Sequence, residues 1–355
     1  MKRAGYLYEQ IYSWENLLLA YKKARQAKKG WQVEDYSYNW EHALYDTQQD
    51  LKNQCHQFGA YHQFKIYEPK ERVITSAPFQ DRVVHHAICN VIGPVLDKPL
   101  IVDSYACRKG KGMHRAVKKA FYWYKNSQYH YRLDIRKFYY SIDHGILLWM
   151  LARKIKDAKV LELMKRLLET HDDGRDHYTP FPGDDLLDMI RPRGLPIGNL
   201  TSQVLANFYL SGLDHFIREK MHLVKYVRYM DDMVVFGDDQ AGLRQARQLI
   251  LEELARIRLH RNTSKDYIAS NRQGLDFLGF RLVGSTIRVR SQNLCRFRRK
   301  MKAKSRDHSI ELSKLLLSYN GHLGYLLGGH SKKICNDILN DIVFQNDQRK
   351  WKLVV

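Results

Sequence analysis

The spacing of apolar residues along the chain predicts a mixture of helices and short strands. Ile11, Trp14, Leu18 and Tyr21 recur at intervals that place them on one face of a helix, which we expect over residues 8–29, with Gly30 ending it. The same period predicts further helices over residues 40–60, 81–96, 146–170, 202–220, 241–257 and 312–326. Alternating positions predict strands over residues 61–76, 129–135, 226–236 and 275–290. The pattern therefore indicates an α+β protein.

The predicted hairpin at residues 226–236 is the stretch that most directly suggests chemistry. Its two arms are rich in Val, Tyr and Phe, and Asp231-Asp232 stands between them, where we expect the chain to reverse at a two-residue tip. Two adjacent carboxylates raise each other's pKa, and a bound divalent cation removes that repulsion. The alternative is an acidic surface turn without a ligand, so the interpretation depends on what the rest of the chain supplies.

Another aspartate lies inside a predicted strand. Asp134 follows the apolar run that begins at Tyr129, and because aspartate is depleted from strands its position calls for a partner. Either a metal ion or one of the neighbouring arginines would serve. Three further Asp pairs, at 172–173, 184–185 and 238–239, lie among Gly, Pro and polar residues, and we expect them to be loop acids without a metal role.

Composition points to a polyanionic partner. The chain has 355 residues, enough for two or three domains, and a formal net charge of +21. Such a balance indicates binding to nucleic acid or to an anionic membrane. No run approaches the roughly 18 apolar residues of a membrane span, and the first residues lack the apolar core of a signal peptide. The five cysteines are scattered and form no C-x-x-C pair, which excludes a disulfide scaffold and a cysteine-based zinc site. We therefore expect a cytoplasmic protein that binds nucleic acid and no membrane.

Basic side chains gather in three segments that suit contact with phosphate. The hairpin at residues 61–76 presents Lys70 and Arg72, and a Gly-containing loop at 104–115 precedes a helix, an arrangement that brings N–H groups and cations close to phosphates. The side chains expected to contact nucleic acid in this loop and in the C-terminal basic run are Arg108, Lys109, Lys111, Arg296, Arg298, Arg299 and Lys300. A solvated basic face is the alternative for such segments.

The aspartates and the basic segments together suit phosphoryl transfer. Asp134, Asp231 and Asp232 would bind two Mg²⁺ ions that activate a 3′-hydroxyl for in-line attack on a nucleotide α-phosphate. Mg²⁺ prefers carboxylate oxygens, water and phosphate, so no His or Cys ligand is needed. The loop at residues 194–203 contains two glycines before a predicted helix, and we expect its backbone to permit close approach by a flat ligand such as a base pair.

The order of these motifs resembles that of reverse transcriptases over about residues 60–290. Tyr229-Met230-Asp231-Asp232 is similar to the family's catalytic hairpin, and Leu133-Asp134-Ile135 to its first catalytic strand. Further similarities lie at Arg72, Asp81-Arg82, Ser104 to Gly112 and Leu278-Gly279. The resemblance implies a right-hand polymerase fold, with an N-terminal helical extension at residues 1–60, fingers and palm at 61–292 and a helical thumb at 293–355.

The loop from Ile197 to Gln203 narrows the resemblance to the reverse transcriptases of diversity-generating retroelements. Its Ile-Gly-x-x-x-Ser-Gln form resembles that class, whereas most bacterial relatives carry Gln-Gly-x-x-x-Ser-Pro, and Glu15-Asn16-Leu17 is similar to the opening segment of the class. The resemblance implies an RNA-directed DNA polymerase that takes dNTPs, copies a structured template RNA and binds the RNA–cDNA duplex. It also implies mutagenic retrohoming with a small, basic, oligomeric accessory variability protein.

The resemblance also assigns roles to individual residues. The metal site comprises Asp134, Ile135, Asp231 and Asp232, where the three aspartates are catalytic and hold two Mg²⁺ ions, for which Mn²⁺ can substitute. The nucleotide site comprises Lys70, Arg72, Tyr139, Ile197, Gly198, Gln203 and Lys265. Tyr139 stands where the family keeps an aromatic steric gate against a ribose 2′-OH, and Arg72 and Lys70 would hold the triphosphate.

Ile197 leads to a hypothesis about fidelity. A Gln at this position can hydrogen-bond the template or nucleotide, whereas Ile offers only apolar contact. Loss of a polar check on pairing corresponds to about 1–3 kcal/mol of discrimination, or one to two orders of magnitude. We therefore expect an error-prone polymerase, with errors that the resemblance places at template adenines. Two alternatives are a retron or phage-defence reverse transcriptase of ordinary fidelity and a non-catalytic RNA-binding protein on the same fold.

Overall fold

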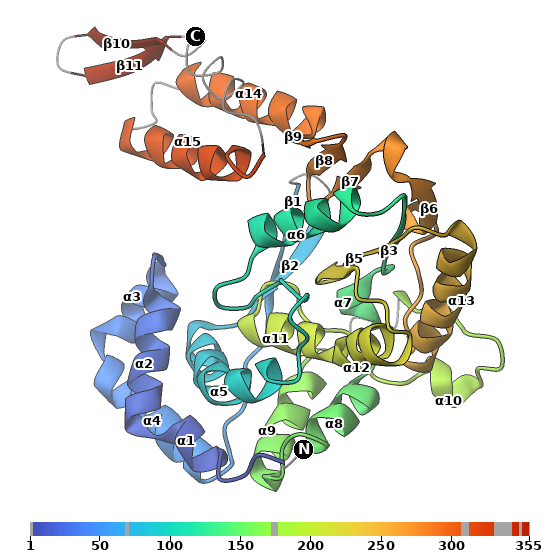
Figure 1. Cartoon of the computed structure of the whole chain (residues 1–355). Coiled ribbons are helices and arrows are strands. Elements are labelled where there is room, and N and C mark those ends of the chain that lie inside the picture. Colours follow the sequence, from blue (N-terminus) through green and yellow to red (C-terminus); the bar gives the residue numbers. More distant parts are fainter. Residues whose placement is uncertain are drawn as a thin grey trace.

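The computed structural model describes residues 3–67, 71–171, 177–306, 312–329, 343–347 and 350–354, and it combines many helices with four small sheets (Figure 1). The α-helices are α1 (Tyr8–Tyr12), α2 (Trp14–Arg25), α3 (Trp31–Tyr38), α4 (Trp40–Lys52), α5 (Phe79–Asp97), α6 (Met113–Lys125), α7 (Phe138–Ser141), α8 (His144–Ala152), α9 (Ala158–Glu169), α10 (Leu186–Met189), α11 (Leu200–Tyr209), α12 (Ser211–His215), α13 (Gln240–Arg256), α14 (Ser291–Arg306) and α15 (Leu312–Leu326). The strands are β1 (His62–Ile66), β2 (Arg72–Ser76), β3 (Tyr129–Asp134), β4 (Tyr226–Tyr229), β5 (Asp232–Gly237), β6 (Tyr267–Ser270), β7 (Leu275–Phe277), β8 (Phe280–Val283), β9 (Thr286–Val289), β10 (Val343–Asp347) and β11 (Lys350–Val354). Within these residues, no helix has the length and apolar character that a membrane span requires.

A four-stranded antiparallel sheet organises the centre of the molecule. Its strand order is β4-β5-β3-β6, so β3 pairs with both β5 and β6. Side chains alternate between its two faces. In β5, Met233 and Val235 belong to one apolar core, whereas Val234 and Phe236 belong to the other. This alternation fixes the register of the strands, because a slip of one residue would exchange the two faces.

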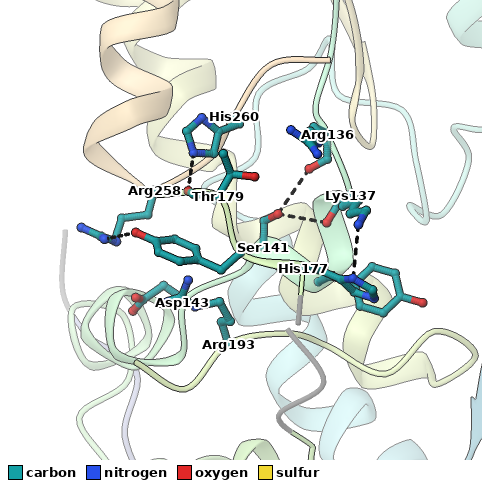
Figure 2. A pocket seen from close by; sticks show the side chains of 11 residues that line it. Arg136, Lys137, Ser141, Asp143, His177, Thr179, Arg193, Arg258 and His260 are labelled. Carbon is teal, nitrogen blue, oxygen red and sulfur yellow. Dashed lines mark hydrogen bonds between the residues drawn. The ribbon is translucent and has the colours of Figure 1, made fainter. Parts of the chain in front are cut away.

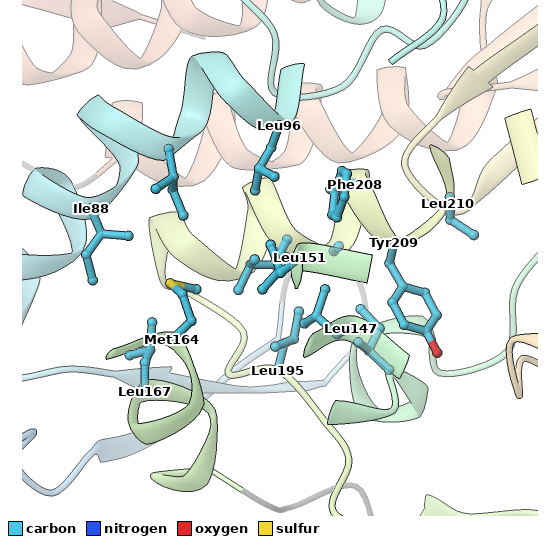
Figure 3. Packing of buried hydrophobic residues seen from close by; sticks show 14 of the residues in the cluster. Ile88, Leu96, Leu147, Leu151, Met164, Leu167, Leu195, Phe208, Tyr209 and Leu210 are labelled. Atoms are coloured by element: carbon cyan, nitrogen blue, oxygen red, sulfur yellow. The ribbon is translucent and has the colours of Figure 1, made fainter. Parts of the chain in front are cut away.

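Helices cover one face of this sheet, and a second small sheet helps to cover the other. The larger core joins the N-terminal helices, α5, α8, α9 and α11 to the sheet, and Figure 3 shows part of it around Leu147, Leu151 and Phe208. The smaller core joins α6, the three-stranded sheet β7-β8-β9, and Phe297 and Met301 of α14. The central sheet is thus held rigidly from both sides.

Capping side chains mark breaks in two of the predicted helices. The helix expected over residues 8–29 breaks at Ser13, whose side chain accepts a hydrogen bond from Asn16 N and caps α2. The helix expected over 146–170 divides into α8 and α9, because Asp157 caps α9 and also accepts hydrogen bonds from the N–H groups of Leu7 and Tyr8. A local cap therefore sets the first break, whereas contacts between residues about 150 positions apart accompany the second.

The C-terminal part also differs from the expectation. Residues 275–282 are not one hairpin arm, since β7 and β8 pair with each other around Leu278 and Gly279, which both have positive φ (49° and 81°). A Cβ on Gly279 would clash with the Tyr325 hydroxyl and with Asn293, so the turn and α15 require glycine there. Beyond α14 and α15, β10 and β11 form an antiparallel hairpin, where a wholly helical thumb over 293–355 was expected.

Candidate active site

The hairpin of β4 and β5 carries two of the three predicted catalytic aspartates, but its tip lies one residue earlier than predicted. Tyr229 pairs with Asp232, so Met230 and Asp231 form the turn and Asp232 is the first residue of β5. Met230 has a φ of 56°, which lets the chain reverse in two residues. The predicted tip at Asp231-Asp232 was wrong because Asp232 takes part in strand pairing. As a result, Asp231 lies in the turn while Asp232 belongs to the sheet.

Asp134 meets the hairpin at the end of β3. Asp134 is the register partner of Asp232, so the two aspartates lie side by side on adjacent strands. Ile135 follows as a buried residue bridged to Arg261. The backbone therefore brings Asp134 close to Asp231 and Asp232, which are about 100 residues further along the chain, at one end of the central strands β3 and β5.

Cationic side chains hold two of the three carboxylates. Lys265 Nζ donates to Asp134 Oδ1 at 2.8 Å and Asn262 Nδ2 donates to Asp134 Oδ2 at 2.8 Å. Arg132 Nη2 donates to Asp232 Oδ2 at 3.1 Å. The partner of Asp134 is therefore a lysine, and the neighbouring arginine binds Asp232 instead. Sequence reasoning placed Lys265 near the site but missed Arg132 and Asn262. Arg132 is a charged residue inside an apolar strand, the same signal that drew attention to Asp134.

Among the described residues, Asp231 has no comparable cationic partner, and its environment disfavours the charged form. Burial, and then the neighbouring charge of Asp134, raise the pKa of Asp231 to about 6. In this arrangement no three His, Cys, Asp or Glu side chains of the described residues converge as a metal site, since Asp134 and Asp232 are turned toward their cations. The donor set nevertheless fits a hard cation, because it consists of carboxylate oxygens with excess negative charge.

A buried network fixes the hairpin from behind. Arg228 and Asp214 are both fully buried and joined at 2.5 and 2.7 Å, and Arg228 also donates to Asn207 Oδ1 and to the carbonyl of Met230 in the turn. Sequence reasoning missed all three side chains of this network. An arginine within the apolar strand 226–229 could have indicated it, because a buried charge requires a partner.

The residues predicted for the nucleotide site partly converge. Burial raises the pKa of Tyr139, Cys107 and Asp231 raise it further, and Arg72 lowers it. The carbonyl of Ile197 accepts a hydrogen bond from Thr75 N of β2 at 2.8 Å, and Gln203 Oε1 contacts the Cys107 thiol. Lys70 lies outside the described residues.

Gly198 packs closely against β2. Its φ is 125°, and a Cβ there would approach Ile74 Cγ2 to 3.0 Å and the Thr75 carbonyl to 3.4 Å. Within the chain, the close neighbour of this glycine is therefore β2. The contact ties the β1–β2 hairpin to the start of α11.

Among the residues predicted to contact nucleic acid, Arg108 has partners within the chain. Its guanidinium binds Asp97 at 2.6 and 3.2 Å and donates to the carbonyls of Ile101 and Ser104, so it holds the loop together. Lys109 is exposed, and Lys111 donates to the carbonyl of Val102. On α14, Arg296, Arg298 and Arg299 are exposed around the buried Phe297, and Lys300 is half-buried.

The other Asp pairs have structural partners. Asp184 binds Arg258 at 2.8 Å and Asp185 caps α10, while Asp238 binds Lys225 at 2.8 Å and Asp239 caps α13. These are the loop roles that were expected of them. Residues 172–173 lie outside the described residues.

A comparison with protein families decides the broad assignment. The family model described as "Reverse transcriptase (RNA-dependent DNA polymerase)" matches residues 65–282, which is more than half of the chain. The chain belongs to this reverse transcriptase family. The match begins in β1 and ends in β8, so it contains the whole central sheet and all three aspartates.

Individual relatives of this reverse transcriptase are distant. The group II intron-encoded protein LtrA of Lactococcus lactis is 22% identical over 312 residues, covering 68% of this chain and 49% of LtrA. Protein YkfC of Escherichia coli is 21% identical over 263 residues, covering 62% of this chain and 66% of YkfC. A 91 kDa protein in the cob intron of Schizosaccharomyces pombe is 27% identical over 147 residues, which is 17% of its length. The chain thus spans less than two thirds of these relatives.

A solved structure shares the fold. Apo telomerase from Candida tropicalis superposes with a TM-score of 0.50 and 12% identity, covering 69% of this chain and 52% of that chain. The architecture is therefore the right-hand polymerase fold that the sequence motifs implied.

Proposed function

We propose that this reverse transcriptase is an RNA-directed DNA polymerase in which Asp134, Asp231 and Asp232 hold the catalytic divalent cations. The observation that carries the proposal is the strand register, which sets Asp134 opposite Asp232 with Asp231 in the adjoining turn. When bound, two Mg²⁺ ions would activate a primer 3′-hydroxyl and stabilise the leaving pyrophosphate. Ile135, directly after β3, would contribute to the metal site through its backbone. Mn²⁺ would be able to substitute for Mg²⁺.

Binding of divalent cations would then release Lys265 and Arg132 from their aspartate partners. Lys265 and Arg132 balance the carboxylates of Asp134 and Asp232 in this structure, and a divalent cation would take over that charge. Lys265 is about two-fifths exposed and can therefore turn toward the nucleotide phosphates. The pKa of Asp231 is raised by burial and by Asp134, so a bound cation would stabilise its charged form.

The remaining roles follow the sequence motifs and are part of the proposal. Arg72 and Lys70 would hold the triphosphate, and Tyr139 would exclude a ribose 2′-OH. Ile197, Gly198 and Gln203 would support the base pair indirectly, since this loop braces β2. Arg296, Arg298, Arg299 and Lys300 on α14, with Lys109 and Lys111, would contact the RNA–cDNA duplex. We assign residues 1–60 to an extension, 61–292 to fingers and palm, and 293–355 to the thumb.

The finer assignment is mutagenic retrohoming in a diversity-generating retroelement. Ile197, which offers no polar contact where a Gln could, supports error-prone copying at template adenines. The net charge of +21 supports a large, structured template RNA as partner, and a small basic accessory protein would complete the assembly. A retron or phage-defence enzyme of ordinary fidelity is the competing assignment within the same family.

Deep sequencing of cDNA tests both levels of the proposal. The purified protein would be given an RNA template, a primer, dNTPs and Mg²⁺, beside an Asp231→Asn variant. We expect cDNA from the wild type, at least a hundredfold less from the variant, and substitutions concentrated at template adenines. Product that is equal in both proteins would exclude the metal assignment, and faithful product would move the enzyme to the retron or defence class.

A second variant tests the link to Ile197. Ile197→Gln should lower misincorporation at template adenines by roughly one order of magnitude while leaving the yield of cDNA similar. Ile74→Val, a change of one methyl group in the neighbouring β2, serves as the control. An unchanged error spectrum in Ile197→Gln would remove Ile197 from the explanation of fidelity.

A further inference from the structure

The side chain of Asn207 on α11 joins elements that approach the catalytic hairpin from distant parts of the chain. Asn207 is 2% exposed. Its Oδ1 accepts hydrogen bonds from Arg228 Nη1 of β4 at 2.8 Å and from the Ser104 hydroxyl at 3.2 Å. Its Nδ2 donates to the carbonyl of Ala106 at 3.0 Å. Neither aspartate nor leucine, which are similar in size, can both accept and donate in this way.

Through Arg228, the amide reaches the turn that carries Asp231. The Nη1 group that donates to Asn207 Oδ1 also donates to the carbonyl of Met230 at 3.2 Å, and Nη2 donates to the carbonyl of Asn207 at 3.3 Å. Met230 has a φ of 56°, a left-handed conformation that residues other than glycine rarely adopt, so the turn depends on contacts that hold it. Asn207 therefore supports the residue directly before Asp231.

The amide also holds the segment at residues 103–106 against β4. Arg228 N donates to the carbonyl of Asp103, and Tyr105 N donates to the carbonyl of Arg228, both at 3.0 Å, so the segment runs along this edge strand. Cys107, the next residue, contacts a side chain of the proposed nucleotide site. The position of the amide thus sets the spacing between the catalytic hairpin and the loop beside that site.

The end of β3, which carries Asp134, is held by other contacts. Arg136 N donates to the carbonyl of His260 at 2.8 Å. Figure 2 shows the Ser141 hydroxyl, which donates to the carbonyl of Arg136 at 3.2 Å. The contacts named here share no residue with the network around Asn207. We therefore expect a change at Asn207 to displace the catalytic turn while the end of β3 stays in place.

We propose that Asn207 is a positioning residue that sets the place of Asp231 relative to the other catalytic aspartates, an assignment that rests on the proposed function. Asn207 is buried and acts through Arg228. Loss of its amide would release the turn on one side, so that the carboxylates would meet the metal ions in a poorer geometry. Metal binding and the rate of catalysis should both fall, whereas the affinity for dNTP should change little.

Asn271 provides a matched control within the same sheet. It is 7% exposed, and its amide also makes three hydrogen bonds, each at 2.8 Å, to His130 Nδ1 and to the carbonyls of Tyr124 and Ser127. His130 is the second residue of β3, whereas Asp134 is its last. Asn271→Ala therefore removes as many hydrogen bonds as Asn207→Ala does, but at the opposite end of the strand from the aspartates.

The first experiment measures metal binding without catalysis. Mn²⁺ is titrated into the full chain in the absence of dNTP and nucleic acid, and free Mn²⁺ is followed by electron paramagnetic resonance. We expect Asn207→Ala to weaken binding at least tenfold, as is typical when a residue that orients a metal ligand is removed, and Asn271→Ala to leave it within about twofold of wild type. Unchanged binding in Asn207→Ala, or equal losses in the two variants, would overturn the positioning role.

The second experiment measures primer extension at saturating Mg²⁺. Asn207→Ala should lower kcat at least tenfold with KM for dNTP within about twofold of wild type, and Asn271→Ala should change neither. Urea denaturation should show similar losses of stability in the two variants, which would exclude unfolding as the cause. An equal fall in kcat in both variants would overturn the inference. Mn²⁺ binding that depends on Asn207 in a chain that makes no cDNA would refute the proposed function alone.

Ser104→Ala tests the same network if Asn207→Ala does not fold. It removes one hydrogen bond to Asn207 Oδ1 and leaves the amide in place. We expect Mn²⁺ binding and kcat to fall in the same direction as in Asn207→Ala but only about threefold. A folded Ser104→Ala variant with the Mn²⁺ binding and kcat of wild type would contradict the role of this network.

Discussion

Two arginine–aspartate pairs lie close to the catalytic hairpin and differ in how firmly they are held. Arg228 and Asp214 are fully buried, and their contacts are 2.5 and 2.7 Å. Arg132 and Asp232 are 10% and 14% exposed, and their contacts are 3.1–3.4 Å. The first pair is supported by Asn207 and Tyr226, whereas the second stands beside Asp134 and Asp231, which repel its carboxylate.

This difference in burial and contact distance indicates that the first pair stabilises the fold, whereas the second belongs to the proposed metal site. A fully buried pair with every neighbour engaged cannot exchange partners without leaving a charge in an apolar environment. In the second pair, which has longer contacts and further carboxylates beside it, the aspartate can exchange its arginine for a metal ion. The same two residue types therefore fix the turn at one position and leave a ligand available at the other.

The largest effect is expected when the supporting pair is broken. Asp214→Ala leaves the Arg228 guanidinium buried and unpaired, so the free energy of unfolding should fall by about 3–5 kcal/mol. Urea denaturation of the full chain measures this change. Asp97→Ala is a matched control, because Asp97 is half exposed in its pair with Arg108 and its removal should cost about 1 kcal/mol or less. Equal losses in the two variants would contradict the supporting role of Asp214.

The buried side chain of His85 should give a smaller change in the free energy of unfolding, and this change should depend on pH. Burial lowers the pKa of His85 to about 4 against an ordinary 6.5, with Asp81 opposing the shift and His86, His56 and Arg82 adding to it. The unfolded chain gains a proton near pH 6.5 and the folded chain only near 4. The stability from the neutral imidazole is therefore present above pH 6.5 and is lost as the pH falls toward 4, by roughly 2–3 kcal/mol.

The measurement is a pair of unfolding curves against pH. His85→Leu should lose less stability than wild type between pH 7 and pH 4, by the same 2–3 kcal/mol. His42→Leu is the control, since His42 is largely exposed and its substitution should leave the pH dependence as in wild type. Parallel curves for wild type and His85→Leu would mean that His85 titrates normally in the folded chain.

How far the sequence could predict this site depends on the range of the contacts involved. The arms of the hairpin were predictable because their β-branched and aromatic residues alternate locally, and the order of the motifs along the chain was enough to imply the fold. The turn was misplaced by one residue, since pairing of Tyr229 with Asp232 depends on which faces of β4 and β5 are buried. Arg132 and Lys265 lie 100 and 131 residues from their carboxylates, a separation that no local pattern encodes.

The smallest effect on stability, joined to a large effect on activity, is expected at Asp232. Asp232→Ala removes a contact with Arg132 but also removes burial and repulsion by Asp134, which raise the pKa of this carboxyl against the opposing effect of Arg132. The two contributions oppose each other, so the free energy of unfolding should change by about 1 kcal/mol or less, while cDNA synthesis falls at least a hundredfold. Asp238→Ala, at an exposed pair with Lys225, should change neither quantity appreciably. If Asp232→Ala destabilised the chain as much as Asp214→Ala does, both arginine–aspartate pairs would stabilise the fold. Asp232 would then not be a carboxylate that is available to a metal ion.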